Sequence, residues 1–298
     1  ILDEEDYPVW AYDRDKTELA SLLPQGRVRL FDRSDFQSGA LSIGNIDVLL
    51  HFDFADYDQP AAELAQTLAF SNELFTSAAM HHTPAIVHIS TKSVYGSDRA
   101  SCGSEEMPAA PDTAFAQAAY AAELMLRNLS RINNQVKATS LRLATLIGED
   151  YGYLPPVGLP GRPQQQNALP DNHSETDADN PEVVEWLDIR DAVQAIKSVI
   201  KVPESQWKPI YNVGSGRTCS TQKITEIIAA HTKEPDKKVG SKPITEDVTA
   251  GMQESIDNSL FRKDTGWKPS YGMGETIDSL ISHFQPQVPE TKKVPLSP

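Results

Sequence analysis

Short apolar runs alternate with longer alanine- and leucine-rich segments through the first two thirds of the chain. The segments between the apolar runs predict helices at 16–23, 61–80 and 114–131. Strands that alternate with helices of this length indicate βαβ units, so we predict an α/β fold built on a parallel sheet. The apolar runs predict five strands, at residues 8–12, 27–31, 46–52, 85–90 and 138–143.

The pattern changes after residue 150. Residues 150–181 are rich in proline, contain a Gln-Gln-Gln run and end in an acidic cluster, which predicts a long loop; a functional lid and a plain insertion both stay open. The tail 285–298 has several prolines and few apolar residues, and we expect it to be disordered. The rest predicts strands at 183–189 and 210–213, and helices at 191–201, from Ser220 or Thr221 to about 230, and at 274–284.

Composition narrows the choice of partners and compartment. The 298 residues hold 27 Lys and Arg against 42 Asp and Glu, a formal charge of −15, which argues against nucleic acid or an anionic membrane as the main partner. No apolar run approaches the ~20 residues of a membrane helix. The two cysteines, Cys102 and Cys219, have no metal-ligand spacing and are typical of reduced thiols, so we expect a cytoplasmic protein without a metal.

Residues 88–96, with the sequence His-Ile-Ser-Thr-Lys-Ser-Val-Tyr-Gly, follow directly on a predicted buried strand. Ligands of open α/β sheets bind at the carboxyl ends of the strands, so the Thr91 hydroxyl is expected at the edge where a ligand would bind. Lys92 lies beside it. A threonine that merely satisfies hydrogen bonds at a strand end is the alternative interpretation.

Seven further motifs occur along the chain, and each is a weak signal on its own. Together with the segment around Thr91, their order and spacing resemble the extended short-chain dehydrogenase/reductase family, in its NAD-dependent epimerase/dehydratase (nucleotide-sugar epimerase) branch. The motifs are Asp13 at a strand end, Phe-Asp-Arg-Ser-Asp at 31–35, Asp-Val-Leu-Leu-His at 47–51, Leu-Arg-Leu at 141–143 with Gly148, Trp-Leu-Asp-Ile-Arg-Asp at 186–191, Tyr-Asn-Val-Gly-Ser-Gly at 211–216 and Gly-Trp-Lys-Pro at 266–269.

The resemblance implies a Rossmann-like, doubly wound parallel sheet with a small C-terminal substrate lobe. Residues 1–149 would form the dinucleotide-binding core, and 150–284 would complete the sheet and form the lobe. It implies NAD or NADP as cofactor, a nucleotide sugar as small-molecule substrate, and a homodimer. The implied cofactor-binding positions are Asp13, Arg14, Asp32, Arg33, Phe52 and Asp53, and the implied substrate-binding positions are Thr91, Lys92, Thr145 and Val184. An acid at 13 suits an adenosine ribose, whereas Arg14 suits a 2′-phosphate.

The glycine turn that opens the family's fold is not found in this sequence. Its backbone approaches the pyrophosphate at a helix N-terminus. Residues 1–12 already resemble the end of the first helix and the second strand. Either about 25–30 residues, one βα unit, are missing upstream, or the protein binds a dinucleotide poorly. The first is the simpler interpretation, since Ile1 is not a natural start.

The family's catalytic Tyr-x-x-x-Lys pair is also replaced. Aligned by Pro111 and Glu123, its positions fall on Phe115 and Ala119. In the family the tyrosine transfers a proton and the lysine lowers its pKa, and neither replacement supports that chemistry. Tyr120 lies five residues beyond Phe115, roughly 140° around the helix from the required face, and is read as an ordinary helix residue.

Positions for the sugar nucleotide have changed too. The family's asparagine falls on Thr145 and an arginine on Val184, while Asp53 and Phe54 replace small residues near the dinucleotide. Two hypotheses remain: an NAD(P)-dependent epimerase/dehydratase-like protein with atypical or impaired catalysis, in which Thr91 alone of the usual catalytic residues persists, and a catalytically inactive pseudoenzyme that acts as a binding or regulatory module.

Overall fold

The protein is built around a four-stranded parallel sheet with helices on both faces. The sheet has the order β3-β4-β5-β9, with β3 at Val48–His51, β4 at Ala85–Thr91, β5 at Lys137–Leu143 and β9 at Ile210–Val213. The computed structural model describes residues 8–13, 20, 28–38, 46–52, 61–97, 102–148, 151–152, 183–220, 222–224, 226–227 and 255–284. This arrangement confirms the α/β fold class expected from the alternating pattern.

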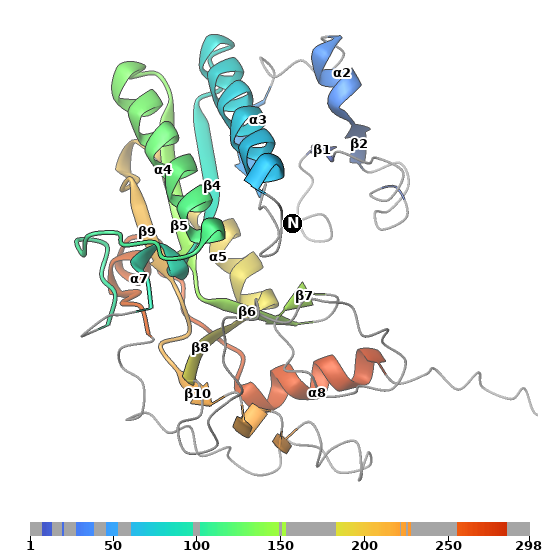
Figure 1. Cartoon of the computed structure of the whole chain (residues 1–298), viewed down its shortest axis with the longest axis vertical. Helices are drawn as coiled ribbons and strands as arrows, with labels where there is room; N and C mark the ends of the chain where they lie inside the picture. The colour runs from blue at the N-terminus through green and yellow to red at the C-terminus, as the bar shows by residue number, and fades with distance from the viewer. Residues whose placement is uncertain are drawn as a thin grey trace, which may run out of the picture.

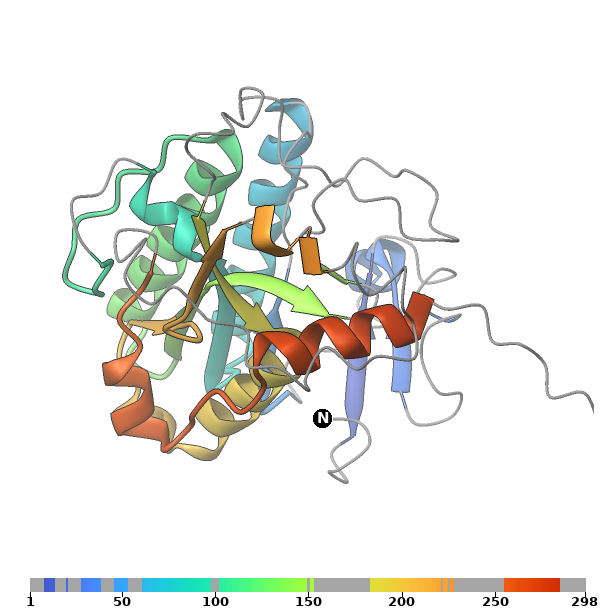
Figure 2. The same cartoon turned by 90° about the horizontal axis from the view of Figure 1, so that it is seen from below.

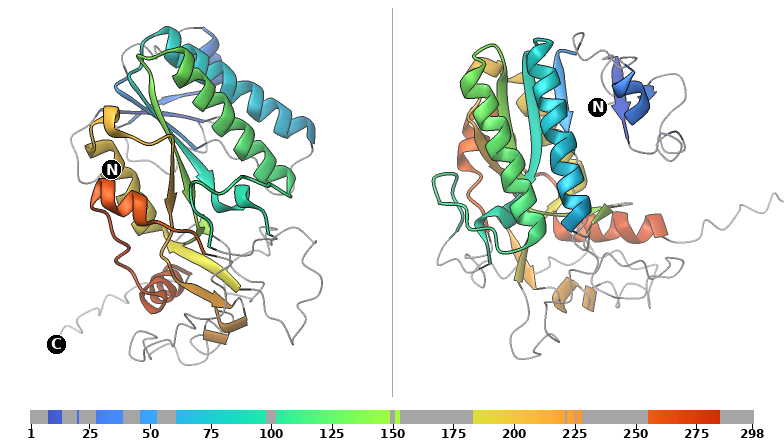
Figure 3. Two further views of the ribbon diagram at one scale, coloured as in Figure 1. Left: turned by 90° about the vertical axis from the view of Figure 1, so that its left-hand side faces the viewer. Right: turned by 45° about the horizontal axis from the view of Figure 1, so that its top comes forward.

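Two long helices cover one face of this sheet and two shorter ones cover the other (Figure 3, left). α3 (Ala61–Met80) and α4 (Ala114–Ile132) lie side by side on the first face. α5 (Ile189–Lys201) and α7 (Ser259–Thr265) lie on the second. The first six residues of β4 are buried because both of its faces are covered and both of its edges are paired.

β1 (Val9–Tyr12) and β2 (Val28–Phe31) form a separate two-stranded parallel sheet. They lie beyond β3 and pack against α3 rather than pairing with β3 (Figures 1 and 3). The Tyr12 ring stacks on Phe70 of α3 with ring centroids 4.9 Å apart, and Phe31 joins the same apolar cluster. Among the described strands, none pairs with the second edge of β1 or of β3, and the apolar residues of β3 are accordingly only half-buried.

A second, smaller sheet lies below the first and has the order β10-β8-β6-β7. β6 (Thr145–Gly148) continues almost directly from β5, so the small sheet also uses residues before position 150. α8 (Met273–Phe284) runs across it (Figure 2) and buries Met273 and Ile277 against it. Its other strands are β7 at Tyr151–Gly152, β8 at Val183–Asp188 and β10 at Thr218–Ser220.

The expected helices at 61–80, 114–131, 191–201 and 274–284 are confirmed to within two residues at their ends. α2 (Arg33–Gln37), α7 and β6 were not expected. Residues 222–224 and 226–227 are helical, as the cap at Ser220 suggests. Nearly all of the expected helix at 16–23, most of the loop at 150–181 and the tail 285–298 lie outside the described residues. None of the described helices is long and apolar enough to cross a membrane.

Gly96 closes the motif that contains Thr91, and its backbone requires glycine. It has φ 78° and ψ 171°, a region that L-residues with a side chain essentially do not occupy. A Cβ at this position would also collide with the carbonyl oxygen of Ala110. Gly266, with φ 73° at the C-terminus of α7, is a useful contrast because nothing lies within 4 Å of its would-be Cβ.

Replacing Gly96 with alanine should therefore destabilise the protein more than replacing Gly266. Gly266→Ala carries only the left-handed strain, about 1–2 kcal/mol. Gly96→Ala adds backbone strain of up to ~3 kcal/mol and a clash with main chain. Urea unfolding of the two variants measures the difference, and equal midpoints would contradict the conformation described for Gly96.

Candidate functional site at the carboxyl ends of the parallel strands

Thr91 is the last residue of β4, at the carboxyl edge of the parallel sheet. Its side chain is half-buried. Its hydroxyl accepts a hydrogen bond from the Ser93 backbone N–H and donates one to Ser93 Oγ, both at 3.2 Å. It thereby caps the short 3₁₀ helix η2 (Lys92–Tyr95), which Lys92 begins. The position is the one expected for a substrate-facing hydroxyl, and the hydroxyl also has a local structural role.

α4 turns Phe115 and Ala119 toward the sheet. The helix begins after Thr113, whose Oγ accepts a hydrogen bond from the Ala116 N–H at 3.2 Å. Phe115, Ala119 and Glu123 are spaced by four, so they share one face of the helix, and all three are at most 7% exposed. Neither Phe115 nor Ala119 carries a group that transfers or stabilises a proton.

Tyr120 lies on a different side of α4. It lines a cavity of about 90 Å³ between α4 and the first residues of β5 and β9, together with Arg127 and Ile210. That cavity is near the amino ends of the strands, away from Thr91. The interpretation of Tyr120 as an ordinary helix residue agrees with this placement.

A buried ion pair holds the register of α4 against the sheet. Arg142 of β5 donates from Nε and Nη2 to the two carboxylate oxygens of Glu123, at 2.9 and 2.6 Å. Ser90 donates to the same carboxylate at 2.6 Å. Burial alone lowers the pKa of Arg142, but the hydrogen bonds and charge of Glu123 more than offset burial and raise it. Arg142 is therefore charged at neutral pH.

The network continues to β9 through Tyr95. The Arg142 guanidinium lies over the Tyr95 ring at 4.6 Å from its centroid, and the Tyr95 hydroxyl donates to Asn212 Oδ1 at 2.8 Å. Asn212 in turn donates to the Gly103 carbonyl and, from its backbone, to Glu105. Burial raises the pKa of Tyr95. The buried phenol is thus committed to Asn212 rather than to a ligand.

Two buried histidines lie just beneath the sheet edge, and sequence reasoning did not single them out. His51 of β3 and His88 of β4 are register partners, and their Nδ1 atoms are 2.9 Å apart. The signal available in the sequence was a histidine at the same height in each of two neighbouring parallel strands. Both side chains are buried, so the pair packs beneath the carboxyl edge of the sheet and supports it.

The expected adenosine positions lie at the ends of β1 and β2. Asp13 is exposed, and its backbone N–H donates to the Phe31 carbonyl at 3.1 Å. The Asp32 carboxylate accepts from the Ser34 and Asp35 N–H groups and caps α2, which Arg33 begins. Asp32 therefore shapes the turn rather than offering a free carboxylate.

The remaining predicted positions are spread over both sheets. Phe52 follows β3 and is 52% exposed at the edge of the parallel sheet. Thr145 begins β6 and is half-buried. Val184 packs in the apolar core of the small sheet with Cys219 and is 7% exposed. Arg14 and Asp53 lie outside the described residues.

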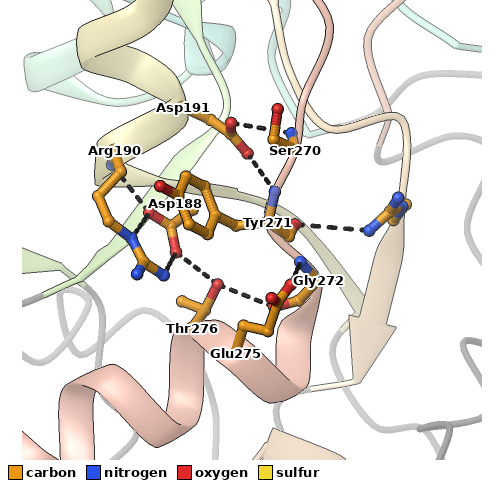
Figure 4. Close-up of polar contacts among 9 residues, drawn as sticks. Asp188, Arg190, Asp191, Ser270, Tyr271, Gly272, Glu275 and Thr276 are labelled. Atoms are coloured by element: carbon orange, nitrogen blue, oxygen red, sulfur yellow. Dashed lines mark hydrogen bonds and ion pairs between the residues drawn. The ribbon is translucent and has the colours of Figure 1, made fainter. Parts of the chain in front are cut away.

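A polar cluster fixes the small sheet and α8 to α5 (Figure 4). Asp188 caps α5, accepts two hydrogen bonds from the Arg190 guanidinium and a third from Thr276 Oγ1 at 2.6 Å. The guanidinium stacks 3.7 Å from the Tyr271 ring centroid. Asp191 accepts from the Ser270 and Tyr271 N–H groups, and burial raises its pKa. This cluster sets the position of the small sheet relative to the parallel-sheet edge.

The family to which the chain belongs follows from the sequence match. A model of the NAD dependent epimerase/dehydratase family matches residues 1–214, more than two thirds of the chain. The chain belongs to that family. It is 23% identical over 232 residues to a UDP-glucose 4-epimerase from Mycolicibacterium smegmatis, with 76% of this chain and 71% of that protein aligned. It is 22% identical over 225 residues to a dTDP-glucose 4,6-dehydratase from Actinoplanes sp., with 74% and 67% aligned.

Solved structures of the family share the fold. A UDP-glucuronic acid 4-epimerase from Bacillus cereus, in complex with NAD, superimposes with a TM-score of 0.68 at 15% identity, over 95% of this chain and 90% of that one. A UDP-glucose 4-epimerase from Thermotoga maritima, with UDP-glucose, gives 0.69 at 17% identity over 93% and 91%. These likenesses confirm the Rossmann-like architecture of this family member.

Neutralising Glu123 tests the role of the buried pair. Glu123→Gln leaves the Arg142 charge unpaired in the core, which should lower the free energy of unfolding by about 3–5 kcal/mol. Glu226→Gln is the matched control, since Glu226 pairs with Lys223 on the surface, where such pairs contribute about 0–1 kcal/mol. Urea unfolding compares the two. A loss as small as that of the control would show that the pair does not hold α4.

Proposed function

We propose that this chain is a nucleotide-sugar epimerase/dehydratase-like protein whose acid–base chemistry is impaired. The observation that carries the proposal is the buried, apolar face formed by Phe115 and Ala119. Glu123 on the same face is fixed to Arg142, so rotating the helix to bring another residue to these positions would break a buried ion pair. The register supports reading Phe115 and Ala119 at the positions of the family's tyrosine and lysine.

The loss of those two groups has a calculable effect. A positioned acid or base contributes about 10²–10⁴-fold to a rate, and Phe115 offers no proton in its place. The phenol of Tyr95 does not substitute, because it is buried and donates to Asn212. Thr91 retains a hydroxyl at the sheet edge, which orients a bound group without replacing a base. Turnover by the usual route should thus be very slow.

The residues present fit one half of an NAD-type cofactor and not the other. On the adenosine side, the exposed Asp13 carboxylate at the end of β1 suits a ribose diol, and the capped turn at Asp32 supplies a rigid wall. On the nicotinamide side, Ala119 has no charge and Phe115 no hydroxyl for a second ribose. NAD and NADP are not distinguished, since Arg14 lies outside the described residues.

We also propose that one more strand fits between β1 and β3. β1 and β3 are both parallel-sheet strands of a doubly wound fold, yet they do not pair with each other. Their apolar residues are half-buried where central strands are normally covered. One further parallel strand, x, between β1 and β3 would complete a sheet of the order β2-β1-x-β3-β4-β5-β9. The turn after that strand would supply the glycine-rich contact to the pyrophosphate, which the described residues do not provide.

The second candidate function is a binding or regulatory module without turnover. The difference between the buried polar contacts and the apolar proton-transfer positions favours it. The buried contacts that link Glu123, Arg142, Tyr95 and Asn212 are in place, whereas the positions for proton transfer are apolar. The scaffold that shapes a ligand site is present, whereas the acid–base side chains at positions 115 and 119 are not. The two candidates differ only in whether residual turnover exists.

Restoring the acid–base pair tests the proposal directly. We expect Phe115→Tyr/Ala119→Lys to raise epimerase or dehydratase turnover of UDP-glucose or dTDP-glucose at least ~10²-fold, as measured by NMR of the sugar. Phe115→Leu/Ala119→Met, which changes the same positions without adding an acid or base, should give no gain. Thr91→Val in the restored protein should remove the gain.

The result that would contradict impaired catalysis is ordinary turnover by the unaltered protein, roughly 1–10³ s⁻¹, abolished by Thr91→Val.

The fit of the cofactor predicts equal affinity for NAD and ADP-ribose. If only the adenosine half is bound, NAD and ADP-ribose at the same concentration should give the same thermal shift, about 2.7 kcal/mol of added stability at 100 times their common dissociation constant. In Phe115→Tyr/Ala119→Lys, NAD should stabilise more than ADP-ribose. Stabilisation of the unaltered protein by NAD alone would contradict the assignment.

A further inference from the structure

His51 and His88 form an unusual contact between two buried imidazoles. The side chains are 2% and 1% exposed, and their facing Nδ1 atoms are 2.9 Å apart, a hydrogen-bond distance. His51 is the last residue of β3, directly before Phe52, and His88 lies three residues before Thr91 on β4. The pair therefore lies immediately beneath the edge that carries the candidate site.

The contact between the two Nδ1 atoms limits where the protons of the pair lie. It is a hydrogen bond only when one Nδ1 carries a proton and the other accepts it. The Ser71 hydroxyl of α3 lies 3.1 Å from His51 Nε2 and 3.0 Å from the Thr67 carbonyl oxygen. His51 therefore has a polar neighbour at each ring nitrogen.

His88 Nε2 is one of the few buried side-chain nitrogens and oxygens without a hydrogen-bond partner within the described residues. The arrangement suits two neutral imidazoles, because the contact between the two Nδ1 atoms holds one proton and not two.

The surroundings only partly compensate an added charge, because burial outweighs the Glu123 carboxylate and the His51 and Ala119 backbone groups that favour a charged His88. On α4 the charged group acting on His88 is Glu123, which already binds Arg142 of β5 and Ser90. On α3 the partners are the neutral Ser71 and the Phe75 ring, whose centroid is 4.7 Å from that of His51. Burial lowers the pKa of His88 to about 4 and the pKa of His51 well below its usual value.

We propose that the His51–His88 pair is an acid-sensitive lock that joins α3 to the strands bearing the candidate site. A further proton on the accepting nitrogen of this contact would set two N–H groups against each other at 2.9 Å, break the shared hydrogen bond and place a charge in the core. That event favours separation of the helices from β3 and β4, next to Phe52 and Thr91.

The direction of the pH effect follows from the lowered pKa values. An unfolded histidine titrates near pH 6.5, whereas folded His88 resists protonation down to about pH 4. Below pH 6.5 the unfolded chain binds more protons, so stability is complete above that pH and is lost as the pH falls toward 4. From pH 7 to 5, linkage predicts a rise in the unfolding constant of about 20-fold for His88, and the lowered pKa of His51 acts in the same direction.

Native-state hydrogen exchange at pH 7 and pH 5, corrected for intrinsic exchange rates, tests the lock. The full chain is compared with His51→Leu/His88→Leu, which keeps the volume and removes both titrating groups. His81→Gln, a change to an exposed histidine, is the matched control. We expect α3 and β3 to lose at least 20-fold in protection at pH 5 in the unaltered chain and the control, but not in the double variant. The same loss in all three proteins would overturn the proposal.

Imidazole ¹⁵N NMR of the unaltered chain covers the case in which the double variant does not fold. Two neutral rings at pH 7, joined by a shared Nδ1 proton and staying neutral until the protection of α3 is lost, would support the lock. A ring of the pair that takes up a proton above pH 6 without loss of protection would overturn it.

Discussion

The Glu123–Arg142 ion pair is the contact on which the placement of the candidate site depends. It joins α4 to β5 in the core, with two hydrogen bonds between the groups and a third from Ser90. A buried pair of this kind is costly to break, so α4 is confined to one rotation about its axis. That rotation directs Phe115 and Ala119 toward the sheet. The chemical character of the site follows from a contact that takes no part in chemistry.

The residues that support the candidate site differ from those proposed to occupy its catalytic positions. The support consists of buried polar contacts among the strands, α4 and the segment near Gly103, and of the Asp188–Arg190–Tyr271 cluster that positions the small sheet. The hydrogen bonds among them satisfy buried groups such as Asn212 and Asp188, so their loss would cost stability. Proton transfer imposes no such structural demand, and apolar side chains at 115 and 119 leave the fold intact.

The sequence predicted those parts of the fold that depend on periodicity and local caps. The parallel strands and long helices carry strong patterns, and Thr91 was placed correctly because a strand end is a local feature. β6 was missed because Thr145–Gly148 is short and continues from β5 after a single residue. The His51–His88 contact was missed because it depends on strand register, which no local pattern encodes. Val184 was expected near the substrate, but which face of β8 is covered depends on α8, far along the chain.

A crystal structure of the chain grown with NAD and UDP-glucose tests the central claim, the register of α4, most directly. The account predicts Glu123 paired with Arg142, Phe115 and Ala119 on the sheet side, and the Tyr120 ring in the cavity beside Arg127 and Ile210. A helix rotated so that the Tyr120 hydroxyl lies beside Thr91, with Glu123 released from Arg142, would contradict it and would return a proton donor to the site.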